Sequence, residues 1–153
     1  MSDFLSNFEK ANKIAKRLSN KILIDGKLIS PSTDSKIKVI DPSTGEGIGN
    51  APKCNKVDVD HAVKSSLSAF KEWKKIPARE RGRLVEQGAR KLEERRDEIE
   101  TLLALDTGNA LRTQAKPETA ASIELTRMFA GLSGEIKGEN YPPNISNTLH
   151  FTT

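Results

Sequence analysis

The chain has 153 residues, of which 35% are hydrophobic, 5% aromatic and 30% charged, and its formal net charge is +4. This length is enough for one domain, but the low apolar content is typical of a surface-rich piece whose apolar face needs a partner. Basic and acidic residues are interleaved rather than clustered, which argues against nucleic-acid binding.

The cysteine content and the hydropathy indicate a cytoplasmic protein. Cys54 is the only cysteine, so the chain cannot form an internal disulfide. The sequence shows no signal peptide and no apolar run long enough to cross a membrane. We therefore expect no role for the glycosylation sequon at residues 144–146.

Residues 1–20 have the pattern of an amphipathic helix, because apolar side chains recur at helical spacing and basic ones lie mostly on the other face. A membrane-surface or targeting role is one interpretation, but Asp3 and Glu9 are unusual in a transit peptide. We expect the helix to dock on the rest of the protein instead. Its apolar face consists of Phe4, Leu5, Phe8, Ala11, Ile14, Ala15 and Leu18.

Residues 21–52 alternate short apolar runs with turn signals, which predicts two small β-hairpins. The signals are Asp-Gly at 25–26, Ser-Pro-Ser at 30–32 and Pro-Ser-Thr-Gly at 42–45. The glycines at 45, 47 and 49 could suggest a phosphate loop, but such a loop follows a strand and precedes a helix. Here a turn precedes them and Pro52 follows, so phosphate binding is disfavoured.

From Asn55 onward the pattern becomes helical. Asn55 is expected to cap the first helix, with Asp58 completing a capping box. Phe70 and Trp73 could form an aromatic partner patch, although packing of the last helical turn onto a core is the preferred interpretation. The predicted inner stripe is Val59, Ala62, Val63, Ser66, Phe70 and Trp73.

Two further helical stretches follow. Pro77 is a first-turn residue for the second helix, the charged residues 93–98 predict a bend in it, and Gly108 is expected to end it. A third helix is predicted to start near Pro117 and to fade near residues 134–138. The apolar residues expected to face inward are Leu84, Val85, Leu92, Ile99, Leu102, Leu103 and Leu105 in the second helix, and Ala121, Leu125, Met128, Phe129 and Leu132 in the third.

The last residues are predicted to be extended. Pro142 and Pro143 break the chain, after which apolar and polar residues alternate. An isolated strand at residues 147–153 would present unpaired backbone groups, which favours association.

Few side chains suggest catalysis. Cys54 is the only thiol and precedes a helix N-terminus, a mildly activating place. His61 and His150 lie on different predicted elements without metal-ligand spacing, so we expect no zinc site. A Ser-His-Asp set assembled from distant positions stays open.

Asp106 stands at a helix C-terminus, where the helix dipole disfavours a carboxylate by up to about 1 kcal/mol. Such a residue invites either a hydrogen-bonded turn or a bound cation.

Residues 21–153 resemble the N-terminal portion of the NAD(P)-dependent aldehyde dehydrogenases. The motifs that carry the resemblance occur in the family's order. They are Ile-Asp-Gly at 24–26, Asp-Pro-Ser-Thr-Gly-Glu at 41–46, Ala-Phe-Lys-Glu-Trp at 69–73, Pro-Ala-Arg-Glu-Arg at 77–81, Glu-Glu-Arg-Arg-Asp-Glu-Ile at 93–99 with Leu-Asp-Thr-Gly at 105–108, and Ala-Gly-Leu at 130–132 with Gly-Glu-Ile-Lys-Gly-Glu at 134–139.

The resemblance implies an α/β fragment in which most of the family's parallel sheet is absent. Residues 1–20 would be an amphipathic N-terminal helix and residues 21–52 a β-hairpin region. Residues 53–139 would be the incomplete helical part of a Rossmann-type cofactor-binding domain, and residues 140–153 an extended oligomerisation strand.

The resemblance also implies a function. The complete enzyme oxidises an aldehyde to a carboxylic acid with NAD or NADP, but its nucleophilic cysteine, general base and cofactor loop have no counterpart here. No catalytic or cofactor-binding residue is therefore assigned, and we expect the chain alone to be inactive and to bind no NAD or NADP. The expected partner is the remainder of the enzyme, or a homo-oligomer formed through the terminal strand. The alternative is a standalone helical interaction module that docks on a full-length enzyme.

Many members of this family bind a monovalent cation near the second hairpin. Carried onto this chain, the ligands would be the carbonyls of Val39 and Ile40 and the carboxylate of Asp106, whose hard oxygens suit such an ion. The alternative is that Asp106 only bonds backbone groups around Thr107 and Gly108. The role of Asp106 is expected to be structural either way.

Overall fold

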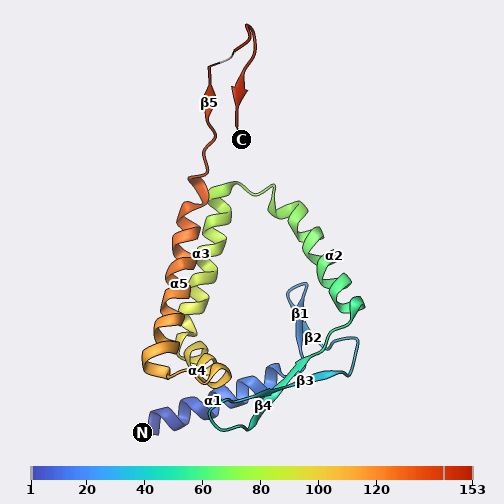
Figure 1. The fold of residues 1–153 in the computed structure, drawn as a ribbon, viewed down its shortest axis with the longest axis vertical. Coiled ribbons are helices and arrows are strands. Elements are labelled where there is room, and N and C mark those ends of the chain that lie inside the picture. Colours follow the sequence, from blue (N-terminus) through green and yellow to red (C-terminus); the bar gives the residue numbers. More distant parts are fainter. Residues whose placement is uncertain (1, 143, 153) are drawn as a thin grey trace.

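The computed structural model describes residues 2–142 and 144–152, with side chains from residue 8 onward. Helices and small hairpins alternate along the chain, as Figure 1 shows. The elements are α1 (Ser2–Leu18), β1 (Ile22–Ile24), β2 (Lys27–Ile29), β3 (Lys36–Ile40), β4 (Gly47–Pro52), α2 (Lys56–Trp73), α3 (Ala78–Glu94), α4 (Arg96–Thr107), η1 (Leu111–Ala115), α5 (Lys116–Gly131), η2 (Leu132–Gly134), β5 (Asn140–Tyr141) and β6 (His150–Phe151).

The strands confirm the α/β fragment and the two predicted hairpins. β1 pairs with β2, β3 with β4 and β5 with β6, each pair antiparallel. Within the described residues every sheet has two strands, and none is parallel. The glycines at 45, 47 and 49 belong to the turn and the returning strand of the second hairpin.

The amphipathic helix α1 docks on the rest of the protein, as predicted. Ala11 forms a buried cluster with Ile48 of β4 and Leu105 of α4, and Phe8 and Ala15 pack against this cluster. Leu18 is more exposed than expected, and the side chains of Phe4 and Leu5 lie outside the described ones. Among the residues that the structure describes, no helix is both long and apolar enough to cross a membrane.

The capping box at the start of α2 is confirmed. The Asn55 side-chain oxygen accepts hydrogen bonds from the Val57 and Asp58 amides at 2.8 and 3.2 Å, and Asp58 accepts one from the Asn55 amide at 3.2 Å. Asp58 also accepts a bond from the Ser32 amide at 2.8 Å, which ties α2 to the segment after β2. This bond to Ser32 is the main reason why the pKa of Asp58 lies below its ordinary value.

The predicted burial of the α2 stripe is wrong for this chain. Phe70 is 56% exposed and Trp73 38%, and Val59 and Val63 are exposed as well. Figure 1 shows the reason, since α2 stands apart from α3 and α5. The spacing of apolar residues identifies a face that needs covering, but it does not say whether the covering residues belong to the same chain.

Helices α3 and α5 lie side by side (Figure 1). Gly82 and Ala89 of α3 and Ile123 and Ala130 of α5 are buried. A Cβ atom on Gly82 would overlap the Ser133 hydroxyl and the Ala130 carbonyl, so the two backbones approach too closely for a larger residue.

The prediction of which apolar side chains of α3 and α5 face inward is therefore wrong. On α3, Leu84 and Leu92 are exposed and Val85 is half-buried, while every residue of the α5 row is exposed. Beside Gly82 the close approach leaves room for small residues such as Ala130, while Ile123 is a large apolar residue that α5 buries. The exposed α5 row is Ala121, Leu125, Met128, Phe129 and Leu132.

The bend, the helix end and the next helix start fall where the sequence predicted them. Arg95 interrupts the helix between α3 and α4, and Gly108 ends α4 in the left-handed conformation, with φ 73°. Leu105 is buried in α4, and Ile99, Leu102 and Leu103 are half-buried. A π-helical turn, η1, then leads into α5, whose first turn contains Pro117.

The terminal strand is shorter than predicted and is not isolated. β6 covers only residues 150–151 and pairs with β5, with Asn140 opposite Phe151 and Tyr141 opposite His150. The hairpin extends away from the end of α5 in Figure 1. Pro143 and Thr153 lie outside the described residues.

Candidate functional site

The C-terminal turn of α4 holds Asp106 without bonding its carboxylate. The Gly108 amide donates to the Ala104 carbonyl at 3.0 Å, and the Thr107 hydroxyl donates to the Leu103 carbonyl at 2.7 Å. The Asn109 amide donates to the Thr107 hydroxyl at 3.2 Å. Thr107 therefore closes the turn, and the Asp106 carboxylate has no hydrogen bond or ion pair to any described residue.

The turn between β3 and β4 is built around a buried carboxylate. Asp41 is only 3% exposed and accepts bonds from the Ser43 amide at 2.8 Å and the Thr44 hydroxyl at 3.1 Å. Pro42 lies beside Gly108, because a Cβ atom on that glycine would come within 3.1 Å of the Pro42 Cβ. The hairpin turn and the end of α4 are therefore in direct contact.

Two of the three predicted cation ligands lie in one hollow. Val39 of β3 and the exposed Asp106 line a cavity of about 270 Å³, together with Lys21, residues at the C-terminus of α1 and residues 48–52 around β4. Ile40 is more exposed and does not line this cavity. The structure thus brings Val39 and Asp106 together and leaves Ile40 at the edge.

A β-bulge shapes this hollow. Val39 pairs with Gly49 and Ile40 with Gly47, so Ile48 is an extra residue in β4. The bulge coincides with the burial of Ile48 in the cluster formed with Ala11 and Leu105. Neither the bulge nor the contribution of α1 was predicted from the sequence, although the glycines on either side of Ile48 are a signal for a bulge.

Two charged side chains line the hollow. The exposed Asp106 carboxylate stands at the negative end of the α4 dipole, and the Lys21 ammonium already places a positive charge in the same hollow. Among the described residues no group of three or more His, Cys, Asp and Glu side chains could hold a metal ion. An ion site at this place would therefore depend on backbone carbonyls beside Asp106, which suits a monovalent cation.

The other candidate side chains are not brought together. Cys54 is exposed in the loop before α2, His61 is exposed on α2, and His150 is exposed on β6.

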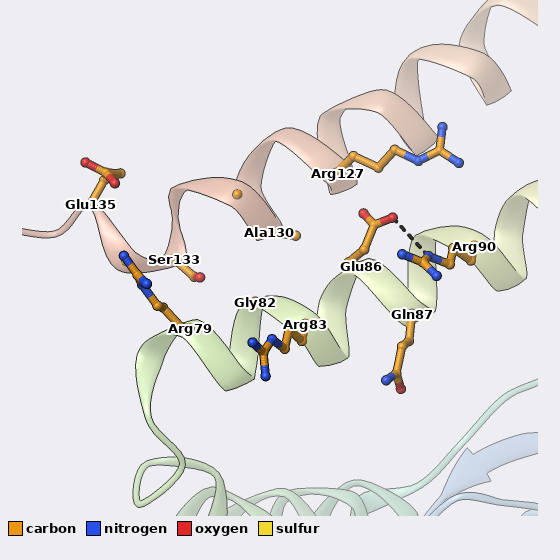
Figure 2. A pocket seen from close by; sticks show the side chains of 12 residues that line it. Arg79, Gly82, Arg83, Glu86, Gln87, Arg90, Arg127, Ala130, Ser133 and Glu135 are labelled. Atoms are coloured by element: carbon orange, nitrogen blue, oxygen red, sulfur yellow. Dashed lines mark hydrogen bonds and ion pairs between the residues drawn. The ribbon is translucent and has the colours of Figure 1, made fainter.

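A larger hollow of about 710 Å³ lies along α3 and α5 and is shown in Figure 2. Only one ion pair among the described residues joins two residues of its lining, Arg90 with Glu86 at 3.2 Å. Arg83 and Arg127 pair with Glu80 and Glu124, which lie outside the lining, at 3.0 and 2.8 Å. In Figure 2, Arg83 and Gln87 point away from α5. This surface is best understood as the packing seam of the two helices.

A profile of the Aldehyde dehydrogenase family matches residues 29–153. Two human relatives are similar to this chain: mitochondrial 10-formyltetrahydrofolate dehydrogenase, 32% identical over 93% of the chain, and its cytosolic counterpart, 33% identical over 87%. The chain spans 15% of the length of each relative.

Solved structures show the same fold. Betaine aldehyde dehydrogenase from Staphylococcus aureus, described in complex with NAD+, matches 94% of the chain with a TM-score of 0.84 and 27% identity. A variant of aldehyde dehydrogenase from Bacillus cereus matches 91% with a TM-score of 0.83 and 26% identity. The chain covers 29% and 28% of these two structures. By its sequence and its fold, the chain belongs to the aldehyde dehydrogenase family.

Proposed function

We propose that this chain forms the N-terminal part of an NAD(P)-dependent aldehyde dehydrogenase that oxidises an aldehyde to a carboxylic acid. The observation that carries the proposal is the family match over residues 29–153 together with the fold shared with a dehydrogenase described in complex with NAD+. In such an enzyme a cysteine thiolate would supply the nucleophile, the bound nicotinamide the hydride acceptor, and water would release the acid from the resulting thioester. We assign none of these roles to a residue of this chain.

We also propose that the 153-residue chain alone is inactive. Its only thiol, Cys54, is exposed, and no hydrogen bond or ion pair joins it to a described residue that could act as a base. The purified chain should therefore give no NADH or NADPH with NAD+ or NADP+ and a panel of aldehydes. Cofactor-dependent turnover by this chain would contradict the proposal, and a full-length relative assayed in parallel controls for the conditions.

The exposed apolar faces of α2 and α5 support the view that the remainder of an enzyme covers them. Phe70 on α2 and Phe129 on α5 are 56% and 63% exposed. Burial of such faces stabilises a folded assembly by roughly 25 cal/mol per Å² of apolar surface. The β5–β6 hairpin, with exposed Tyr141 and Phe151, is the element that we propose for contacts between subunits of a homo-oligomer.

The same exposed faces favour a second candidate, a standalone interaction module that docks on a full-length enzyme. Size-exclusion chromatography with and without a full-length homologue separates the two functions. Co-elution supports docking, and separate elution counts against it. We further propose a cytoplasmic location, supported by the single exposed cysteine and testable by cell fractionation.

We propose a structural monovalent-cation site at Val39, Ile40 and Asp106. The unpaired Asp106 carboxylate and its shared hollow with Val39 support the site, with Ile40 at its edge. Thermal unfolding in KCl or NaCl, compared with choline chloride at equal ionic strength, tests it. We expect the small cations to raise the midpoint of the wild-type protein and to have no such effect on Asp106→Asn.

A further inference from the structure

The junction between α2 and α3 carries the excess positive charge of the chain. Residues 71–83, which we call the basic junction, hold six lysines and arginines but only two glutamates, so this stretch alone accounts for the formal net charge of +4. Basic and acidic residues balance over the rest of the chain. Figure 1 shows the junction as the corner between the two helices, beside the end of α5.

Both glutamates of the basic junction are already paired. Lys75 pairs with Glu72 at 2.8 Å, and Arg83 pairs with Glu80 at 3.0 Å. Four cations remain that form no ion pair with any described residue. They are Lys71, Lys74, Arg79 and Arg81.

Contacts with the backbone and with η2 hold the basic junction in place. Arg81 is half-buried, and its guanidinium donates to the Ile76 carbonyl at 2.6 Å, which ties the linker to α3. The Arg79 side chain lies against η2, since a Cβ atom on Gly134 would be 3.4 Å from the Arg79 Cγ. Figure 2 shows Arg79 beside Ser133 at one end of the α3–α5 hollow. The junction is therefore an ordered surface.

Two of the unpaired cations stand where the helix dipole disfavours them. Arg79 and Arg81 lie within the first four residues of α3, at the positive end of the helix dipole. Pro77 gives no side-chain hydrogen bond to cap this helix. An anionic partner at the junction would therefore be attracted by the side chains and by the helix end together.

The neighbours of these cations indicate which kind of anion fits. Trp73, at the end of α2, is 38% exposed and offers an apolar contact beside the charges. Single-stranded nucleic acid needs a continuous track of cations along its backbone, but Glu72 and Glu80 interrupt the track here. An acidic polypeptide places its carboxylates at separate points and can also cover the indole.

We propose that the basic junction is a docking surface for an acidic polypeptide segment, which places carboxylates on Lys71, Lys74 and Arg79 and an apolar side chain on Trp73. This inference goes beyond the proposed function, because it does not depend on the dehydrogenase reaction. Attraction between exposed charges is screened by salt, so the affinity should fall as NaCl is added.

The test titrates the full chain with a tryptophan-free peptide of glutamates and leucines, and in separate arms with inorganic polyphosphate and a thymidine oligonucleotide of matched charge. Trp73 is the only tryptophan of the chain, so its fluorescence reports directly on the junction. The test variant combines Lys74→Glu with Arg79→Glu. The control combines Lys36→Glu with Lys38→Glu, which changes the net charge equally at exposed residues of β3. Circular dichroism checks that both variants fold.

We expect the peptide to shift the Trp73 emission to shorter wavelength. The junction variant should lose about tenfold in affinity, because each exposed ion pair contributes a factor of up to about five, and the control should lose less than about twofold. Equal losses in the two variants would show attraction by overall charge and overturn the proposal. The absence of a shift with the peptide would overturn it as well, as would tighter binding of polyphosphate or of the oligonucleotide than of the peptide.

Discussion

Two regions of the molecule bury their apolar residues differently. In the N-terminal corner, formed by α1, the β3–β4 hairpin and α4, apolar side chains from three segments meet in one cluster around Ala11, Ile48 and Leu105. In α2 and on the outer face of α5, large apolar side chains such as Phe70 and Phe129 remain exposed. Apolar faces with the same helical spacing are therefore buried within the chain in one region and exposed in the other.

The α3–α5 contact lies between these two cases, because it is closed on its inner side only. Substitutions on the buried side of these helices should therefore destabilise the protein, whereas substitutions on the exposed side should be tolerated.

The largest effect is expected at Ile123, which is 1% exposed on the inner side of α5. Ile123→Ala should lower the free energy of unfolding by about 2–5 kcal/mol, because it removes buried methyl groups and leaves a cavity. Leu125→Ala, on the exposed side of the same helix, should change it by less than about 0.5 kcal/mol. Urea denaturation measures both, and equal losses would contradict the assignment of the two faces.

The next effect is expected where α3 and α5 approach most closely. Gly82→Ala should destabilise the protein by about 1–3 kcal/mol, since the new Cβ would overlap Ser133 and Ala130.

Gly88 provides a matched control in the same helix, because nothing lies within 4 Å of the position of its missing Cβ. Gly88→Ala should stabilise the protein by about 0.4–1 kcal/mol, as alanine is less flexible in the unfolded chain. Opposite signs for the two variants support the close contact, and equal signs would argue against it.

A smaller effect concerns the attachment of α2 and depends on pH. The Ser32 amide lowers the pKa of Asp58 in the folded protein, so Asp58 stabilises the fold above its unfolded pKa of about 3.9. This contribution is lost as the pH falls through the lower, folded pKa.

The wild type should therefore exceed Asp58→Asn in free energy of unfolding at pH 7, and the gap should close below about pH 4. Asp60→Asn on the same helix is the control, because among the described residues its carboxylate bonds only to the exposed Lys56 side chain. A gap that does not vary with pH would contradict the role of the Asp58 carboxylate.

The smallest effect is expected on the unpartnered surface. Phe70→Ser should change the free energy of unfolding of the isolated chain by less than about 0.5 kcal/mol, because its side chain is already exposed. In the presence of a partner that covers α2, the same change should weaken binding. A large loss of stability in the isolated chain would show that α2 packs within it.

Local signals in the sequence predicted the elements well. The turn dipeptides, the Asn55 capping box and Gly108 depend on nearby residues only, so their positions could be inferred from the chain itself. The α/β fragment and the helical and hairpin regions followed from these signals and from the family's motifs.

Burial was harder to predict, because it depends on neighbours that a periodic pattern does not identify. Leu125 and Phe129 were expected inside because they belong to the apolar row predicted for α5, but Ile123 and Ala130 are buried instead. Only part of the lining of the hollow beside Asp106 was predicted from the sequence. Val39 and Asp106 share it, whereas the bulge at Ile48 and the wall formed by α1 depend on packing between distant segments.

The central claim is that α2 and α5 present surfaces that the remainder of an aldehyde dehydrogenase covers. Hydrogen–deuterium exchange of the chain, alone and mixed with a family enzyme from which the corresponding N-terminal region has been removed, tests this most directly. We predict that exchange slows in α2 and on α5 in the mixture, while α1 and β4, already packed in the N-terminal corner, change little. Equal exchange of α2 and α5 in both samples would contradict the claim.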